Sequence, residues 1–247
     1  MLTDAQAREM NKQDKLVLLT QGLLRTGWDH IMSLPRILSL SGDGQLCQEP
    51  CDSVTPLRIP DSHCRVADVA LRADEEHVLR DIISRDAISG DAISGDVIRG
   101  GSGDTLEIVC KIKLNAPSPE ASAGVELCVL RSPDKEEFTK ISFQQGLAVG
   151  TILLDGDRAS TTRRDVRHRP PEKAQVSQMP DGSLQLRVFV DKSIVEVFVN
   201  GKVCVAMRVY PGRPDSRTVS LRATGCDAHL SYLDAWNMRG IYETEAE

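Results

Sequence analysis

The chain has 247 residues, of which 40% are hydrophobic and 27% charged, and its formal net charge is −6. A chain of this length and composition can bury a substantial core and needs no disulfide or metal to fold. The acidic balance excludes non-specific nucleic-acid binding, because a surface that neutralises phosphates needs clustered Lys and Arg.

The first 26 residues predict a short helical extension. Leu, Val and Met recur at loosely helical spacing over residues 4–24, and Thr3 or Asp4 can cap the first turn. The order of a secretory leader, a basic region followed by an apolar one, is missing. The apolar run at 16–24 is interrupted and shorter than the ~20 residues of a membrane span. We therefore expect no signal peptide, no membrane contact and, by default, a cytoplasmic location.

Seven cysteines with non-repeating spacings indicate mostly reduced thiols. Cys47-x3-Cys51 with His63 and Cys64 is the one cluster that suggests a metal, but a second matching pair is missing. We predict no metal and no cofactor.

Between residues 36 and 240, short β-branched runs alternate with Gly, Pro, Asp and Asn. The runs are TLEIVCKIKL (105–114), GVELCVLRS (124–132), LAVGTILLD (147–155), SLQLRVFVD (183–191), SIVEVFVNGKVCVAMRVY (193–210) and TVSLRAT (218–224). Strands of this length without helical periods between them predict an all-β fold, an antiparallel sandwich or barrel. In the run at 183–191, leucines and valines alternate with Gln185 and Arg187, which predicts one face on a core and one nearer water.

Two other segments fit no strand. Residues 81–100 repeat a pentad, DIISR-DAISG-DAISG-DVIRG, which is too short for a solenoid and predicts an irregular loop. Its aspartates suggest calcium, but the EF-hand and nonapeptide spacings are absent. The basic run at 163–169 could hold an anionic or sugar ligand, although in an acidic chain a solvated loop is the simpler interpretation.

Asn200-Gly201 predicts a two-residue type I′ turn between two apolar strands. That register pairs Glu196 with Val205 and makes both faces of the hairpin apolar, so both have to be covered. Glu196 is the exception on its face. We expect it to pair with an arginine such as Arg208 or Arg187, or to contact another domain or a sugar.

Motifs for nucleophilic hydrolysis and for phosphate binding are absent. There is no G-x-S-x-G, the histidines are scattered, and GGSG at 100–103 lacks the following Lys-Ser/Thr. Trp28 and Trp236 are the only tryptophans, and with 4% aromatic residues both are expected to anchor packing, since a multi-ring sugar platform needs more rings.

Residues 27–50, GWDHIMSLPRILSLSGDGQLCQEP, resemble the segment by which glycoside hydrolase family 32 enzymes (invertases, inulinases, levanases) pass from their catalytic propeller into a C-terminal β-sandwich. Three later stretches resemble the same family in the same order: LLDGDRAS (153–160), LRVFVDKSIVEVFVNGKVCVAMRVYP (186–211) and LDAWNMRGIY (233–242). The resemblance implies two packed antiparallel sheets, jelly-roll-like or concanavalin-like. We expect a sandwich over 27–242, between the extension at 1–26 and a tail at 243–247.

The resemblance also implies where catalysis would reside. In this family two carboxylates act as nucleophile and acid/base, within N-D-P-N-G, R-D-P and E-C motifs of the N-terminal propeller. None of these motifs occurs in the 247 residues. We therefore predict no catalytic residue, and interpret the chain as a non-catalytic module with a structural or docking role beside a catalytic propeller.

Two alternatives stay open: a stand-alone lectin-like module that binds fructan or sucrose-type saccharides, and an enzyme with an unrecognised site. A docking module should expose an apolar patch that prompts self-association or binds a partner, whereas a binding module should show a polar, aromatic-edged groove. The candidate docking or sugar contacts are Trp28, Glu196, Arg208 and Trp236.

Overall fold

The structure is a computed structural model, and it describes residues 31–42, 44–79, 103–115, 123–146, 149–162, 170–177 and 179–241. The predicted helix at 4–24, the pentad repeat, the basic run at 163–169 and Trp28 lie outside the described residues. Leu34–Glu247 forms one compact unit. The predicted boundaries at residues 26 and 243 also fall outside the described residues, and they stay predictions.

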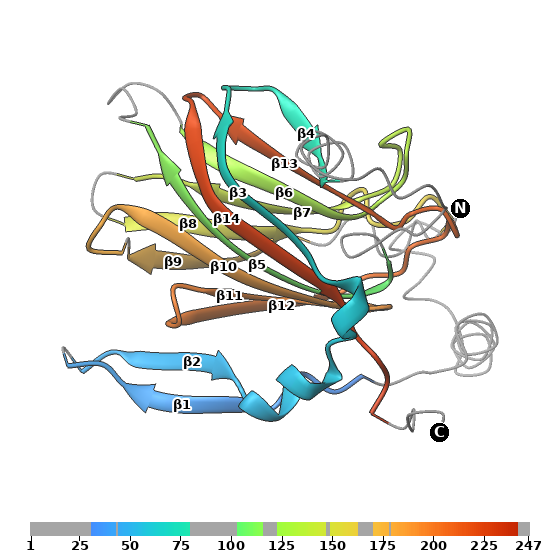
Figure 1. Cartoon of the computed structure of the whole chain (residues 1–247), viewed down its shortest axis with the longest axis horizontal. Helices are drawn as coiled ribbons and strands as arrows, with labels where there is room; N and C mark the ends of the chain where they lie inside the picture. Colours follow the sequence, from blue (N-terminus) through green and yellow to red (C-terminus); the bar gives the residue numbers. More distant parts are fainter. Residues whose placement is uncertain are drawn as a thin grey trace, which may run out of the picture. The chain divides into compact units, whose positions relative to one another are not determined.

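Two six-stranded antiparallel sheets form the body of this unit (Figure 1). The first sheet has the order β12-β11-β10-β5-β14-β3, and its strands are β3 (Cys64–Leu71), β5 (Thr105–Leu114), β10 (Ser183–Asp191), β11 (Ile194–Val199), β12 (Val203–Arg208) and β14 (Ala228–Asn237). The second has the order β4-β13-β6-β7-β8-β9, with β4 (Glu76–Val78), β6 (Gly124–Arg131), β7 (Thr139–Gln144), β8 (Val149–Asp155), β9 (Glu172–Ser177) and β13 (Thr218–Thr224). The predicted antiparallel two-sheet sandwich is confirmed.

A third, small sheet precedes the sandwich strands. It is a hairpin of β1 (Arg36–Leu40) and β2 (Leu46–Pro50), followed by two short 3-10 helices, η1 (Asp52–Leu57) and η2 (Pro60–Ser62). In Figure 1 the hairpin runs beside β11 and β12, and its β2 strand contacts both of them. The segment 34–63 thus lies against the first sheet before the chain enters it at β3.

The core lies between the two sheets and follows from the period of two along each strand. In β10, the side chains of Leu186, Val188 and Val190 are at most 2% exposed and belong to one cluster that spans both sheets. Strands of the second sheet contribute alternate residues such as Leu127 and Ile152 to the same cluster. The apolar positions predicted from the alternation at 183–191 therefore face the core.

The β11–β12 hairpin is shifted by one residue from the predicted register. Asn200 and Gly201 have the positive φ angles, 53° and 64°, that a type I′ turn requires, but an extra residue follows before the strands pair. Glu196 therefore opposes Ala206, where the two-residue turn predicts Val205. Because a one-residue slip exchanges the faces of a strand, the β12 side chains that were expected beside Glu196 join the core instead.

Candidate functional site

Residues 34–63 cover part of the outer face of the first sheet, the face turned away from the second sheet. Phe189 of β10 and Phe198 of β11 are at most 5% exposed and pack with Val54 in a second apolar cluster. Every residue of β11 is buried, which confirms that this hairpin strand is covered on both sides. The alternation predicts that the second face of β10 lies nearer water, and Gln185 and Arg187 on that face are part-exposed as expected. Phe189 is the exception, because it is buried in the cluster with Val54.

Glu107, on the outer face of β5, is fully buried and is held by two arginines. Arg58 donates two hydrogen bonds to it, from Nε at 2.8 Å and from Nη2 at 2.7 Å, and Arg187 donates one from Nε at 2.7 Å. The hydrogen bonds to Glu107 raise the pKa of Arg58. Since Arg58 follows η1 while Glu107 lies in the sheet, this carboxylate ties the covering segment to the sandwich.

Trp236 of β14 lies in the same network. The guanidinium carbon of Arg58 is 3.7 Å from the centroid of its ring, and the His63 ring stacks on it with a centroid separation of 4.7 Å. Two planar groups this close to one ring cannot share a face, so both faces of Trp236 are covered. A sugar could stack on this ring only after one of them moved. The predicted sugar contact stays a prediction, and the geometry favours a packing role.

Glu196 is 2% exposed and takes neither of the two arginines named from the sequence. Its Oε1 accepts a hydrogen bond from the Leu34 backbone N–H at 2.7 Å, and its Oε2 accepts one from Arg36 Nη2 at 3.0 Å. The arginine at 187 bonds Glu107, and the guanidinium of Arg208 lies 5.1 Å from the ring of Tyr210. The expectation of an ion pair is right, but its partner lies 160 residues away in the sequence.

Glu137, in the β6–β7 loop, is a buried carboxylate that the sequence does not distinguish from its exposed neighbour Glu136. It accepts three backbone N–H bonds, from Thr161 at 2.6 Å, Gly212 at 2.9 Å and Arg213 at 3.1 Å, and hydroxyl bonds from Ser216 at 2.6 Å and Thr161 at 2.9 Å. Burial alone would raise the pKa of Glu137, but these hydrogen bonds outweigh it and lower the pKa. One carboxylate therefore joins three loops.

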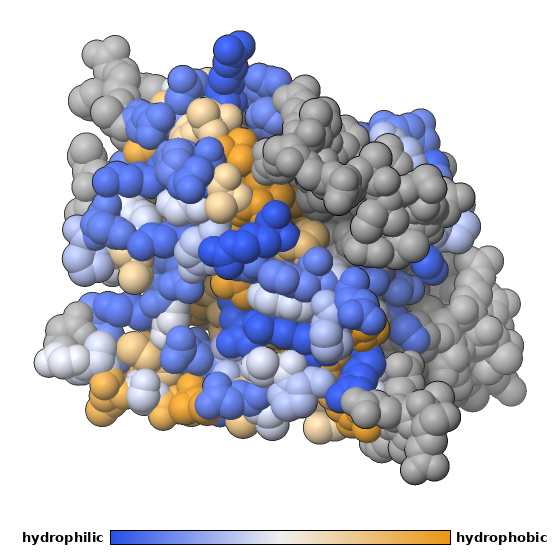
Figure 2. All heavy atoms as spheres, viewed as in Figure 1, coloured by the Kyte–Doolittle hydropathy of each residue, from blue (hydrophilic) through white to orange (hydrophobic). Residues whose placement is uncertain are grey.

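Exposed apolar side chains gather on the β1–β2 hairpin. It carries four of the eight exposed large hydrophobic residues in the described ranges: Ile37, Leu38, Leu40 and Leu46. Leu40 pairs directly with Leu46, and Leu38 lies two residues before Leu40, so these three leucines share one face of the hairpin. Figure 2 shows apolar side chains along the edge of the molecule where Figure 1 places β1.

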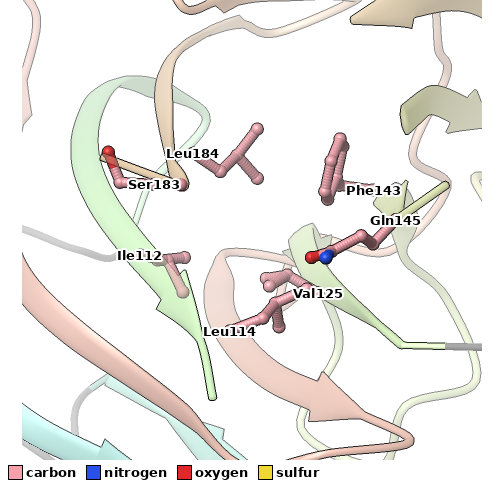
Figure 3. Close-up of a pocket in the computed structure, with 8 residues that line it drawn as sticks. Ile112, Leu114, Val125, Phe143, Gln145, Ser183 and Leu184 are labelled. Carbon is pink, nitrogen blue, oxygen red and sulfur yellow. The ribbon is translucent and has the colours of Figure 1, made fainter. Parts of the chain in front are cut away.

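A small pocket lies where β5 ends and β10 begins (Figure 3). Its lining residues are Ile112, Leu114, Val125, Phe143, Gln145, Gly182, Ser183 and Leu184. The Ser183 hydroxyl is already engaged, because it donates to Asp181 at 2.5 Å, which leaves the Gln145 amide as the polar group among apolar walls. A saccharide site needs several converging polar groups, so this pocket does not fit a sugar.

Metal sites and membrane spans are also missing from the part of the chain that the structure describes. No group of three or more His, Cys, Asp or Glu residues there could hold a metal ion, and all seven cysteines are free thiols. No helix in these ranges is both long and apolar enough to cross a bilayer.

In a comparison with protein families, residues 70–237 match the model described as glycosyl hydrolases family 32 C terminal. Among characterised proteins, the chain is 28% identical over 232 residues to beta-fructofuranosidase, insoluble isoenzyme 3, of Oryza sativa subsp. indica. This alignment covers 87% of the chain and 39% of the rice protein. The insoluble isoenzyme CWINV1 of Arabidopsis thaliana is 26% identical, with 86% of the chain and 38% of that protein covered. The chain thus spans about two fifths of the length of these relatives.

Solved structures share the fold. Fructan 1-exohydrolase IIa from Cichorium intybus superposes with a TM-score of 0.71 at 19% identity, over 89% of this chain and 43% of that one. Exo-inulinase from Aspergillus awamori superposes with a TM-score of 0.63 at 16% identity, over 87% and 37%. At such identities the likeness establishes the sandwich architecture.

Proposed function

The chain belongs to the glycosyl hydrolase family 32 C-terminal domains, and from this premise we propose that it is a non-catalytic module that docks to and stabilises a β-fructofuranosidase-type catalytic domain. The relatives that it matches are more than twice its length, and the family model that it matches describes the C-terminal part of such enzymes. The chemistry named by those relatives would then reside in the portion that precedes the sandwich.

The state of the buried carboxylates carries this proposal. Retaining glycoside hydrolysis needs two carboxyl groups that face one cleft, one of them able to give up a proton. Glu107 is held by two arginines, Glu196 by an arginine and a backbone N–H, and Glu137 by five N–H and O–H donors. Asp234, the fourth buried carboxylate in the described ranges, is held by Arg65 and the His63 ring. Each is therefore held as a structural clamp, and none of them lines the pocket between β5 and β10.

A sugar-binding role has less support. The described pocket is apolar, and both faces of Trp236 are covered by Arg58 and His63. The exposed leucines of the β1–β2 hairpin are the opposite of a polar groove and suit a protein partner.

The test combines isothermal titration calorimetry of the chain with inulin, levan and sucrose, and a sucrose hydrolysis assay. We expect neither heat of binding nor release of glucose and fructose, and a full-length β-fructofuranosidase serves as the positive control in both measurements. Heat without turnover would establish the lectin-like alternative. Turnover by the chain alone would refute the non-catalytic assignment.

A further inference from the structure

The turn between β11 and β12 joins three parts of the fold. The Asn200 N–H donates to the Gln185 carbonyl of β10 at 3.0 Å. The side-chain oxygen of Asn200 accepts the Gln185 N–H at 2.8 Å, and its side-chain nitrogen donates to the Ser177 carbonyl, at the end of β9, at 2.9 Å. The next carbonyl, of Gly201, accepts the Gln48 N–H of β2 at 3.2 Å. The turn thus ties the first sheet to the second sheet and to the β1–β2 hairpin (Figure 1).

The two residues of this turn also form the dipeptide that deamidates most readily. In this reaction the backbone nitrogen after an asparagine attacks the side-chain carbon Cγ, and the side-chain nitrogen leaves as ammonia. Water then opens the resulting succinimide ring at one of its two carbonyls, which gives aspartate or isoaspartate. Glycine favours the attack because it has no side chain to shield its nitrogen. Asn200 is the only asparagine of the chain that precedes a glycine.

The folded turn holds Asn200 away from the reactive geometry. Its φ of 53° and the φ of Gly201, 64°, belong to the tight turn, and both polar atoms of its amide are bonded, to Gln185 and to Ser177. These bonds have to break before Cγ can turn toward the Gly201 nitrogen. Both turn residues are only half-buried, so water reaches them when the turn opens. The rate in the folded chain is therefore the intrinsic rate multiplied by the fraction of time for which the turn is open.

Either product breaks the junction between the sheets. An aspartate at position 200 keeps an oxygen for the Gln185 N–H, but it places a second oxygen, which carries charge, against the Ser177 carbonyl, where an N–H donor stood. Isoaspartate adds one methylene group to the backbone of a turn whose strands begin to pair at once, between Val199 and Val203. In both products the side-chain donor that bonds β9 is lost.

We propose that Asn200-Gly201 is a modification site, at which slow deamidation, gated by the opening of the β11–β12 turn, releases the end of β9 from the first sheet. The Gly201 nitrogen bonds to Cγ of Asn200 and loses its proton to solvent, while the bond from Cγ to the side-chain nitrogen breaks and ammonia leaves. The chain itself is the substrate and water is the co-reactant in the ring opening. This modification does not depend on the proposed docking function.

The first experiment compares the complete chain with the synthetic peptide of residues 193–202, SIVEVFVNGK, in the same buffer at pH 8. Trypsin cuts after Lys192 and Lys202, so the aged chain releases the same peptide, in which mass spectrometry measures aspartate and isoaspartate. We expect both products in the folded chain, at least about tenfold more slowly than in the free peptide, and at the rate of the peptide when urea unfolds the chain. A folded chain that reacts as fast as the peptide, or one that gives no product after many half-lives of the peptide, would overturn the proposal.

A pair of variants tests the gate. Q48P removes the N–H that bonds the Gly201 carbonyl, whereas the matched control Q48A removes the same side chain and keeps that N–H. Because one hydrogen bond fewer holds the turn, Q48P should raise the rate of deamidation in the folded chain by about threefold to tenfold over Q48A. Equal rates in the two folded variants would show that opening of the turn does not control the reaction.

A second pair tests the consequence. N200D reproduces the aspartate product, and N115D adds the same charge at an exposed residue that follows β5. We expect N200D to lower the melting temperature by about 2–6 °C and to speed amide hydrogen exchange in β9, since a bond between the sheets is lost. N115D should leave both quantities unchanged. Parental stability and exchange in N200D, or equal losses in the two variants, would overturn the release of β9.

Discussion

Replacing Glu137 with glutamine should destabilise the sandwich although the two side chains have the same shape. Oε2 accepts from Thr161 N–H, Thr161 O–H and Gly212 N–H, while Oε1 accepts from Arg213 N–H and the Ser216 hydroxyl. A glutamine offers one oxygen and one NH2, so in either orientation at least one of the backbone N–H groups that now bond the buried carboxylate faces another donor. The remaining bonds also lose their charge.

An unsatisfied buried donor costs about 1–3 kcal/mol and charged hydrogen bonds are stronger than neutral ones, so E137Q should lower the free energy of unfolding by about 2–4 kcal/mol at pH 7. For a domain of this size the melting temperature should fall by about 5–12 °C. Urea denaturation followed by circular dichroism measures the first quantity, and calorimetry the second. The control is E136Q, because Glu136 is exposed and should change stability by at most about 0.5 kcal/mol.

The pH dependence of the stability difference between parent and E137Q tests whether the charge of Glu137 is the cause. The pKa of Glu137 is lowered from 4.5 by folding, so its contribution is complete above the unfolded pKa and is lost as pH falls through the folded one. The stability gap between parent and E137Q should therefore narrow progressively below about pH 4.5. A gap that is the same at pH 7 and pH 3, or a variant as stable as the parent at pH 7, would refute the reasoning.

Two further predictions concern the covering segment and the thiols. R58A should lower the free energy of unfolding by about 2–4 kcal/mol, because it leaves Glu107 with one arginine. In a W28F background, where Trp236 is the only tryptophan, R58A should also shift the fluorescence emission of Trp236 to longer wavelength. An unshifted spectrum would contradict the packing of Arg58 on the ring. In a thiol-reactivity assay at pH 8, Cys51 should react first, because hydrogen bonds from Ser53 lower the pKa of its thiol, whereas burial raises the pKa of Cys110 to about 12 and should restrict its reaction to unfolded molecules. Equal rates for the two thiols in the native protein would count against both assignments.

The local sequence pattern predicts most strands, because a strand that is buried on one or both faces carries apolar side chains at alternate or successive positions. The runs at 105–114, 183–191 and 218–224 coincide with β5, β10 and β13. The short, polar β9 has no such signal, since most of its residues are exposed. The register of β11 with β12 was missed because Asn-Gly favours a two-residue turn, and nothing local marks the extra residue that follows it.

Clamps formed between distant residues could not be predicted. The sequence marks Glu196 as a charge on an apolar face and suggests arginines of neighbouring strands as partners, but the actual partner, Arg36, lies 160 residues earlier in the sequence. Glu137 has four charged neighbours within five residues, so only the folded loops show which carboxylate is buried. Whether a carboxylate is buried, and which group it bonds, depends on contacts between residues far apart in the sequence and cannot be read from composition.

Residues 34–63, which lie on the outer face of the first sheet, also limit where this module can be separated from a longer gene. The family match begins at residue 70, but Glu107, Phe189 and Phe198 are sealed by residues 34–63. A fragment that starts at residue 70 would lack the two hydrogen bonds from Arg58 to Glu107 and would expose the rings of Phe189 and Phe198 to water. A recombination breakpoint upstream of Leu34 would keep residues 34–63 together with the sheet that they cover. The unit that can be transferred between genes is therefore longer at its N-terminal end than the region matched by the family model.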